Sequence, residues 1–334
     1  MQKITRLLLT SCFLLVLTLW LGACGQSAGP TSSSSPAGKT LTDVTIGLGY
    51  IPDIQFAPFY VAKAKGYYNE AGLNVTFNHG IVTDLVGSMV AGRNTFVFAS
   101  GDEELTARSK GVQAVNVATI FQRYPVCLIV PADSPIRTLA DLKGHSVGVP
   151  GPYGATYVGL LALLYHEHLS VNDIHLQSIG FTQVAALLGH KVDAVMGYSN
   201  NEPLQLRRQG FAVRTFEVSD YQPLISNGIV TLQTTLRQQP QMVRAFVQAT
   251  LRGLREVIAN PDEALQLSRS YVPGMDVTKA REVLQATIPV WRGNGHLGYN
   301  DPATWQATAS FMVASKLVPT ISDVSAAYTN QFVA

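Results

Sequence analysis

One short segment of the chain has the spacing of a catalytic motif. Residues 144–148 (GHSVG) match the G-x-S-x-G pattern of a nucleophile elbow, in which a serine follows a strand and precedes a helix. Here Ser146 instead follows a turn-like LKG segment and begins an apolar, strand-like run. Because the order is reversed, the sequence does not predict a serine hydrolase.

The histidines and cysteines do not have the spacing of a metal site. His166 and His168 are two residues apart and no His-Glu-x-x-His motif occurs, whereas two ligands on one helix face need a separation of four residues. Cys127 is the only cysteine after Cys24, and it lies in an apolar run. We expect it to be buried as a small hydrophobic residue. We expect no metal site and no catalytic residue.

A further group of side chains suits binding rather than catalysis. Asn201 and Glu202 closely follow an apolar run that ends at Tyr198. An amide and a carboxylate together offer donors and acceptors to the edge of a heterocycle. Phenol rings can stack on its face and form hydrogen bonds at its rim; the candidate rings are Tyr50, Tyr60, Tyr153, Tyr157 and Tyr198. The alternative role for Asn201 is to cap a helix.

Two other loops lie between a strand-like run and a helix. The loop after the first run carries Tyr50, Asp53 and Gln55, and these side chains should face a cleft together with the free N–H groups of the following helix. Ser100 and Asp102 have the same position after the third run. Asp102 is equally suited to cap that helix.

Residues 148–154 (GVPGPYG) resemble a phosphate-binding loop only superficially. The segment has no Gly-Lys-Ser/Thr, and Pro150 and Pro152 remove two of the N–H donors that such a loop needs. The sequence therefore does not predict a nucleotide site. The glycines instead allow Tyr153 and Thr156 to approach a ligand closely.

The elements that must position these side chains alternate between strands and helices. Short apolar runs such as 43–49, 95–100 and 194–198 are separated by stretches with helical spacing such as 84–92 and 153–168. Continuous apolar strands between helices are typical of parallel sheets covered on both faces. The fold class predicted is therefore α/β.

The chain is long enough to form two lobes. A further strand is predicted at residues 224–231, and the remaining residues have helical spacing, so they must pack on an existing lobe. We expect a discontinuous first lobe, 42–130 plus 224–334, and an inserted second lobe, 131–223. The crossings near residues 130 and 223 would form a hinge. Strand ends and helix N-termini should meet in the cleft between the lobes.

The N-terminal segment indicates where the protein works. Lys3 and Arg6 precede an uncharged apolar run over residues 7–21, and small residues then lead to Cys24. The run is shorter than the roughly 20 apolar residues of a membrane span. The segment resembles a bacterial lipoprotein signal, which implies a signal peptide over 1–23 and lipid, including palmitate, on Cys24.

The segment that follows Cys24 predicts a flexible tether. Residues 24–41 are rich in Ser, Gly, Pro, Ala and Thr, a composition that does not bury enough apolar surface to fold. Together with the lipid anchor, this tether would hold the folded body at the cell membrane on its extracytoplasmic face.

The charge balance excludes several kinds of partner. The chain has 24 Lys and Arg against 22 Asp and Glu, and Lys3 and Arg6 would leave with the signal peptide. No basic stripe indicates nucleic acid and no charge block indicates an acidic partner. We expect a monomer.

Short motifs occur along the body of the chain in a fixed order and spacing. They are YIPDIQFAP (50–58), FYVAK (59–63), KGYYNEAGL (65–73), LADLKG (139–144), GVPG (148–151), GYSNNEP (197–203), VRAF (243–246) and ANPDEA (259–264). Together they resemble the ABC-transporter solute-binding proteins that include thiamine-pyrimidine, riboflavin, alkanesulfonate and nitrate binders. The resemblance implies a type II periplasmic-binding-protein fold with parallel-rich sheets, a hinge and an interlobe cleft. It also implies delivery of a small molecule to a membrane permease, with no enzymatic activity and no cofactor.

Within that family, the sequence favours riboflavin. The pyrimidine and flavin binders resemble this chain in having Asn-Glu-Pro at 201–203. Several tyrosines and neutral polar residues suit a three-ring ligand with a uracil-like edge and a polyol tail. The expected ligand-binding residues are Tyr50, Asp53, Gln55, Ser100, Asp102, Tyr153, Thr156, Tyr198, Asn201 and Glu202.

Other ligands remain as alternatives. The first is a thiamine pyrimidine precursor, an aminopyrimidine. A more remote one is an alkanesulfonate or nitrate, against which Asp53, Asp102 and Glu202 at the predicted rim argue. The last is an enzyme similar to a pyrimidine synthase of this fold, whose cysteine-rich iron segment this chain lacks.

Overall fold

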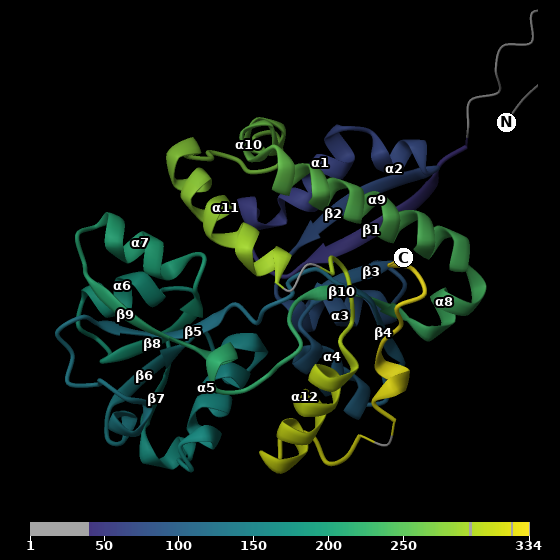
Figure 1. The fold of residues 1–334 in the computed structure, drawn as a ribbon. Helices are drawn as coiled ribbons and strands as arrows, with labels where there is room; N and C mark the ends of the chain where they lie inside the picture. The colour runs from purple at the N-terminus through teal and green to yellow at the C-terminus, as the bar shows by residue number, and fades with distance from the viewer. Residues whose placement is uncertain (1–39, 294–295, 322, 334) are drawn as a thin grey trace, which may run out of the picture. The chain divides into compact units, whose positions relative to one another are not determined.

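The computed structural model describes residues 40–293, 296–321 and 323–333, which build two five-stranded sheets flanked by helices (Figure 1). The predicted signal peptide and Cys24, and the predicted tether up to residue 39, lie outside the described residues. The first sheet has the order β2 (Leu73–His79), β1 (Thr42–Leu48), β3 (Phe96–Ala99), β10 (Gly228–Leu232) and β4 (Ala114–Thr119). The second has the order β7 (His175–Ser178), β6 (Ser146–Val149), β8 (Ala194–Tyr198), β5 (Val126–Pro131) and β9 (Val213–Glu217). The α/β class is confirmed.

Both sheets combine parallel and antiparallel pairs. β1 is parallel to β2 and β3, and β6 is parallel to β7 and β8. β10 is antiparallel to β3 and β4, and β5 is antiparallel to β8 and β9. β5 and β10 are the strands that the chain forms directly after it passes from one sheet to the other. β5 and β10 are antiparallel to both of their neighbours, so neither strand needs the crossover connection that joins parallel strands.

One part of the predicted lobe division is wrong. A boundary after residue 130 assigns β5 to the first lobe, whereas β5 pairs with β8 and β9 in the second sheet. An apolar run such as VCLIV (126–130) reads the same in either sheet, so its composition does not reveal its partner. The first crossing lies between β4 and β5. The rest of the predicted division, with its second crossing near residue 223, stays a prediction.

Most helices lie where the sequence has helical spacing. Two short helices, α7 (Glu202–Arg208) and α8 (Gln233–Gln238), were not predicted. No helix among the described residues has both the length and the apolar character needed to cross a membrane. Helices on the side of the first sheet are α1 (Ala57–Ala64), α2 (Tyr67–Glu70), α3 (Val82–Val90), α4 (Gly101–Ser109), α8 (Gln233–Gln238), α9 (Pro240–Ala259), α10 (Pro261–Ser268), α11 (Val277–Arg292) and α12 (Pro302–Ala314). Those formed by the chain of the second sheet are α5 (Gly154–His166), α6 (Gln183–Leu188) and α7 (Glu202–Arg208).

The C-terminal helix α12 shares a core with the second sheet. Trp305, Phe311 and Met312 are buried in one hydrophobic cluster with Val126 and residues of α5. The ring of Phe311 lies 5.5 Å from that of Tyr165 on α5, edge to face. The end of the chain therefore stabilises both halves of the body, as Figure 1 shows for α12 between α4 and α5.

Helices α1 and α9 pack closely enough to require a glycine. α9 begins at a proline, which suits the first turn of a helix, and it buries an apolar face that includes Val243, Phe246 and Leu254. At Gly253 a Cβ atom would lie 2.3 Å from the carbonyl oxygen of Pro58 and 2.8 Å from Cβ of Ala62. Any larger side chain there must push the two helices apart.

We predict that Gly253→Ala destabilises the protein. Overpacking of this kind costs about 1–3 kcal/mol, which lowers Tm by several degrees in a chain of this size. Gly87→Ala is the matched control, because Gly87 lies on an exposed part of α3 with no atom near the added Cβ. That change should stabilise the helix by about 0.5–1 kcal/mol. Thermal unfolding of both variants checks the prediction, and equal shifts would contradict it.

Candidate functional site

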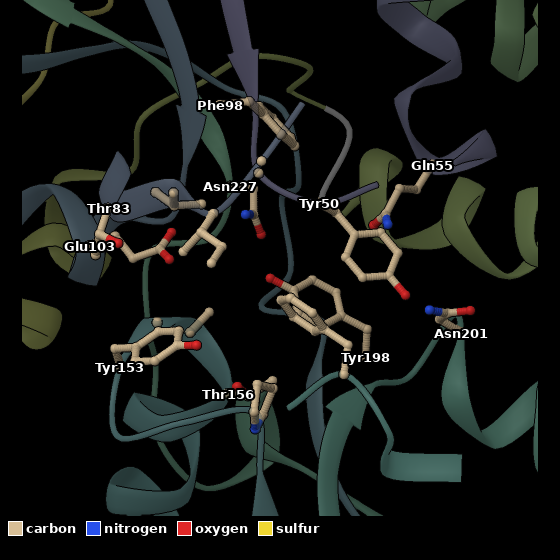
Figure 2. A pocket seen from close by; sticks show the side chains of 18 of the residues that line it. Tyr50, Gln55, Thr83, Phe98, Glu103, Tyr153, Thr156, Tyr198, Asn201 and Asn227 are labelled. Atoms are coloured by element: carbon tan, nitrogen blue, oxygen red, sulfur yellow. The ribbon is translucent and has the colours of Figure 1, made fainter. Parts of the chain in front are cut away.

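A cavity with an empty volume of about 880 Å³, partly open to solvent, lies between loops of the two sheets (Figure 2). β1 and β8 direct their carboxyl ends toward it, so that Tyr50 and Tyr198 reach its wall. α5 and α7 begin there, which adds Thr156 and Glu202. Strand ends and helix starts meet in this way at the binding crevices of open α/β sheets.

Most of the predicted site residues line this cavity. Figure 2 shows several of them around one space, with Tyr50 and Gln55 from the first sheet opposite Tyr198 and Asn201 from the second. The predicted residues in the lining are Tyr50, Gln55, Tyr153, Thr156, Tyr198, Asn201 and Glu202. Whether each binds a ligand stays a prediction.

The other three predicted residues do not line the cavity. Asp53 caps the 3-10 helix Ile54–Phe56, since its Oδ1 accepts a hydrogen bond of 3.0 Å from the N–H of Gln55. Ser100 is the N-cap of α4. Asp102 is completely buried behind the wall, where the hydroxyl of Tyr124 lies 3.1 Å from its Oδ1. The capping alternative therefore applies to Ser100 rather than to Asp102.

The polar corner at the start of α7 is internally bonded. Glu202 accepts the N–H of Tyr198 at 2.7 Å, and the amide of Asn201 donates to Glu202 at 3.3 Å. Asn201 precedes α7 but makes no capping hydrogen bond with its side chain. Its amide instead lies beside the hydroxyl of Tyr50, whose pKa it lowers. Burial raises the pKa of Glu202 to about 7 and, with the charges of Glu202 and Asp53, the pKa of Tyr50 to about 12.

Aromatic rings from both sides form much of the cavity wall. Tyr50 meets Phe181 edge to face with centroids 5.6 Å apart, although Phe181 is 55% exposed. Tyr153 is 41% exposed at the opening. Phe98 and Phe121 contact each other at 5.7 Å and close the inner end. Such surfaces suit a flat ligand.

Two of the candidate tyrosines lie elsewhere. Tyr60 is fully buried and stacks on Tyr271 with centroids 4.9 Å apart, while its hydroxyl bonds Nε2 of His79. Tyr157 packs against the cluster shared by the second sheet and α12. Both rings stabilise the fold rather than line the cavity.

Sequence reasoning did not select several residues of the lining. Glu103 lies in the first turn of α4, next to Ser100 and Asp102, which the sequence did place at the cleft, so only its role was missed. Asn227 lies beside the hydroxyl of Tyr198, whose pKa it lowers, and was predicted as part of a strand that in fact begins at Gly228. The others had no motif to mark them. These unselected residues include Thr83, Phe98, Glu103, Phe121, Phe181, Gln183 and Asn227.

The described lining carries negative but no positive side-chain charge. Glu103 and Glu202 are its carboxylates, and no Lys, Arg or His is among the described residues that line it. Within the described part of the chain, no group of three His, Cys, Asp or Glu side chains could hold a metal ion. The arrangement can stack on an aromatic ligand and hydrogen-bond its edges.

A buried acid lies directly behind the wall. Burial, assisted by the charge of Glu103, raises the pKa of Asp102 to about 7. The hydroxyl of Tyr124 lies 3.1 Å from Asp102 and 2.9 Å from the carbonyl oxygen of Ala155, but it has one proton to donate. When Asp102 is protonated it can donate to Tyr124, and both contacts are then hydrogen bonds.

Comparisons with known sequences identify related binding proteins. A family model described as NMT1/THI5 like matches residues 53–264. The riboflavin-binding protein RibY of Chloroflexus aurantiacus is 40% identical over 318 residues, which cover 92% of this chain and 91% of that protein. The formylaminopyrimidine-binding protein of Halalkalibacterium halodurans is 26% identical, with coverage of 90% and 92%.

A related enzyme and a solved structure complete the comparison. The 4-amino-5-hydroxymethyl-2-methylpyrimidine phosphate synthase of Legionella pneumophila is 23% identical, with coverage of 86% of this chain and 92% of the enzyme. The periplasmic aliphatic sulphonate binding protein SsuA of Escherichia coli superposes with a TM-score of 0.70 at 16% identity, covering 86% of this chain and 97% of that structure. The predicted periplasmic-binding-protein fold is confirmed.

We predict that Asp102 makes stability depend on pH. Between about pH 4 and pH 7 the folded state keeps a proton on this raised-pKa carboxyl that the unfolded chain releases, so the free energy of unfolding falls as pH rises. Asp102→Asn resembles the protonated form and does not titrate. Its free energy of unfolding in urea should fall less between about pH 5 and pH 7.5 than that of wild type, by up to about 1.4 kcal/mol per pH unit.

Asp84→Asn provides the control for this measurement, because Asp84 is exposed on α3. It should follow the wild-type dependence. The same pH dependence in Asp102→Asn and wild type would show that Asp102 does not titrate in this range.

Proposed function

Because the chain belongs to the NMT1/THI5-like family, we propose that it is the solute-binding protein of an ABC importer and captures riboflavin in the cavity between its two sheets. In this proposal the protein binds the vitamin, releases it unchanged to a membrane permease, and is not an enzyme. The relative that shares 40% of its residues is named a riboflavin-binding protein.

The lining of the cavity is the observation that carries the proposal. Rings from both sides, including Tyr50, Tyr153 and Tyr198, surround the space, and ligand sites are typically concave and lined by aromatic and apolar side chains with a few polar groups. Asn201 and Glu202 offer amide and carboxyl groups to the edge of a heterocycle. A flavin presents both a flat apolar face and a hydrogen-bonding uracil-like edge, so it matches both parts of the lining.

An aminopyrimidine is the second candidate. A relative of 26% identity is named a formylaminopyrimidine-binding protein, and the same amide and carboxyl would suit its ring. A single small ring, however, would contact only part of the aromatic wall. We therefore rank riboflavin first.

Two other functions fit the site less well. An alkanesulfonate or nitrate needs cations or many N–H donors, and the described lining offers two carboxylates and no cation. A synthase related to the Legionella enzyme would need groups for chemistry on the ligand. The one cysteine of the described residues, Cys127, is buried within a strand. Riboflavin recovered unchanged after incubation would support a receptor, and a converted product would support an enzyme.

The proposed location follows from the N-terminal sequence. The lipoprotein-like signal over residues 1–23 would be cleaved, and lipid on Cys24 would anchor the body at the extracytoplasmic face of the cell membrane. There the protein can collect solute and pass it to the permease. The proposed form of the body is a monomer.

We predict that single substitutions in the cavity weaken riboflavin binding. Asn201→Ala leaves a polar edge of the ligand without its partner, which costs about 1–3 kcal/mol, or roughly tenfold or more in Kd. Tyr153→Ala removes stacking area, should cost a similar amount and should reduce the quenching of flavin fluorescence. Fluorescence titration of the purified protein with riboflavin measures both effects.

Matched controls separate binding from folding. Asn172→Ala changes an exposed amide, and Tyr165→Ala changes a ring at the far end of α5; neither should change Kd more than about twofold. If wild type binds an aminopyrimidine tightly and leaves flavin fluorescence unchanged, the ligand is reassigned to the second candidate.

We predict that Cys24 is the lipid acceptor. Cys24→Ala should leave the signal peptide uncleaved by the lipoprotein peptidase and abolish incorporation of labelled palmitate, because no other cysteine lies at the end of the apolar run. Metabolic labelling followed by gel analysis tests this. Lipid that still co-purifies with the variant would refute the anchor.

A further inference from the structure

Glu103 lies where helices from the two halves of the body begin. It is in the first turn of α4, and its Oε2 accepts hydrogen bonds from the N–H of Ser100 at 3.0 Å and from the Ser100 hydroxyl at 2.9 Å. Its other oxygen, Oε1, lies beside the first turn of α5, where a Cβ on Gly154 would be 3.4 Å away and the backbone of Ala155 is close enough to lower the pKa of the carboxyl. One carboxylate therefore lies at the N-termini of two helices, α4 from the half of the first sheet and α5 from the half of the second.

The N-cap residue of α5 does not compete with Glu103 for the free N–H groups at the start of this helix. Tyr153, the N-cap residue of this 13-residue helix, provides no capping hydrogen bond from its side chain. Gly154 has a φ of +75°, and a Cβ there would lie 3.4 Å from Oε1 of Glu103. The glycine thus permits both the turn and the close approach of the carboxylate.

The first turn of α5 also faces the ligand space. Gly154, Ala155 and Thr156 line the cavity together with Glu103, and Figure 2 shows Glu103, Tyr153 and Thr156 around the same side of it. A helix N-terminus attracts anions through its free N–H groups and its dipole. In a cavity whose described lining has no cation, this is the position that an anionic group of a ligand would favour.

The groups that hydrogen-bond the Glu103 carboxylate, the N–H and the hydroxyl of Ser100, are both donors, which suits an ionised carboxylate. Burial raises the pKa of Glu103, and the hydrogen bonds from Ser100 and Ala155 oppose that change. A fixed negative charge at this point repels a second anion and satisfies the N–H groups that would otherwise bind it.

We infer that Glu103 is a specificity residue: from the side of the first sheet, its carboxylate occupies the position at the start of α5 where an anion would bind. The residue thereby restricts the cavity to uncharged or cationic solutes. This inference rests on the proposed role of the cavity as a ligand site, and it adds the class of solute that the site excludes. Because Glu103 belongs to α4, it occupies this position only when the starts of α4 and α5 lie side by side.

The test uses inorganic sulfate as the probe and the backbone amide of Ala155 as the reporter. Glu103→Ala removes both the charge and the group at α5, and it should bind sulfate with a saturable change in the NMR signal of Ala155. We expect its affinity for sulfate to be at least about tenfold above that of wild type, because the repelling carboxylate is gone and the N–H groups at the start of α5 are free to bind the anion. Glu103→Gln keeps the size of the side chain and should also lower the Kd for sulfate. It therefore provides the test if Glu103→Ala does not fold.

Glu167→Gln is the matched control, since it neutralises a carboxyl at the C-terminal end of the same helix. It should resemble wild type in sulfate titrations. If neither Glu103 variant gains sulfate binding over wild type and this control, the inference is overturned. The experiment contains no riboflavin, so failure of the vitamin to bind would refute the proposed function and leave this result unaffected.

Discussion

The cavity depends on polar groups that face each other between the two sheets and are shielded from bulk water. A buried donor or acceptor without a partner costs about 1–3 kcal/mol, so loops of one sheet must supply partners for loops of the other. The structure places polar groups of the two halves side by side at four positions in and beside the cavity. They are Tyr50 with Asn201, Tyr198 with Asn227, Glu103 with the start of α5 at Ala155, and Asn200, whose amide donates to the hydroxyl of Thr287 at 2.8 Å.

These pairs explain why the same residues define both the fold and the site. Asn201 lies beside Tyr50 of the opposite sheet, donates to Glu202 at 3.3 Å and also lines the cavity. A ligand that accepts a hydrogen bond from the amide of Asn201 must compensate for the contact that Glu202 loses. Tyr50 itself keeps a second contact with the ring of Phe181. A ligand bound at this corner replaces hydrogen bonds within the protein by hydrogen bonds of its own. Its affinity therefore depends on how well those bonds are aligned rather than on how many it forms.

The sequence predicts elements better than it predicts partners. β8 has the predicted bounds, 194–198, because an apolar run between turns is a local signal. The assignment of β5 failed because strand pairing is not local. The same limit applies to the site. Loops at strand ends identified Tyr50, Tyr153 and Asn201, but Phe181 reaches the cavity from a loop after β7 that carried no motif.

Asp102 shows why residue type alone does not assign a role. A carboxylate just after a strand end can cap a helix, bind a ligand or be buried, and the sequence reads the same in each case. Here Ser100 and Glu103 form the capping pair, which leaves Asp102 to point inward. Only the packed structure shows that its neighbour is the hydroxyl of Tyr124, which in turn contacts the carbonyl oxygen of Ala155.

The position of α12 has a consequence for the order in which the chain can fold. β10 lies between β3 and β4, so the first sheet lacks an inner strand until the chain has passed residue 232. The cluster around Val126 in turn receives Trp305 and Met312 from the last helix. Neither core is complete on a growing polypeptide until nearly all of it has left the ribosome.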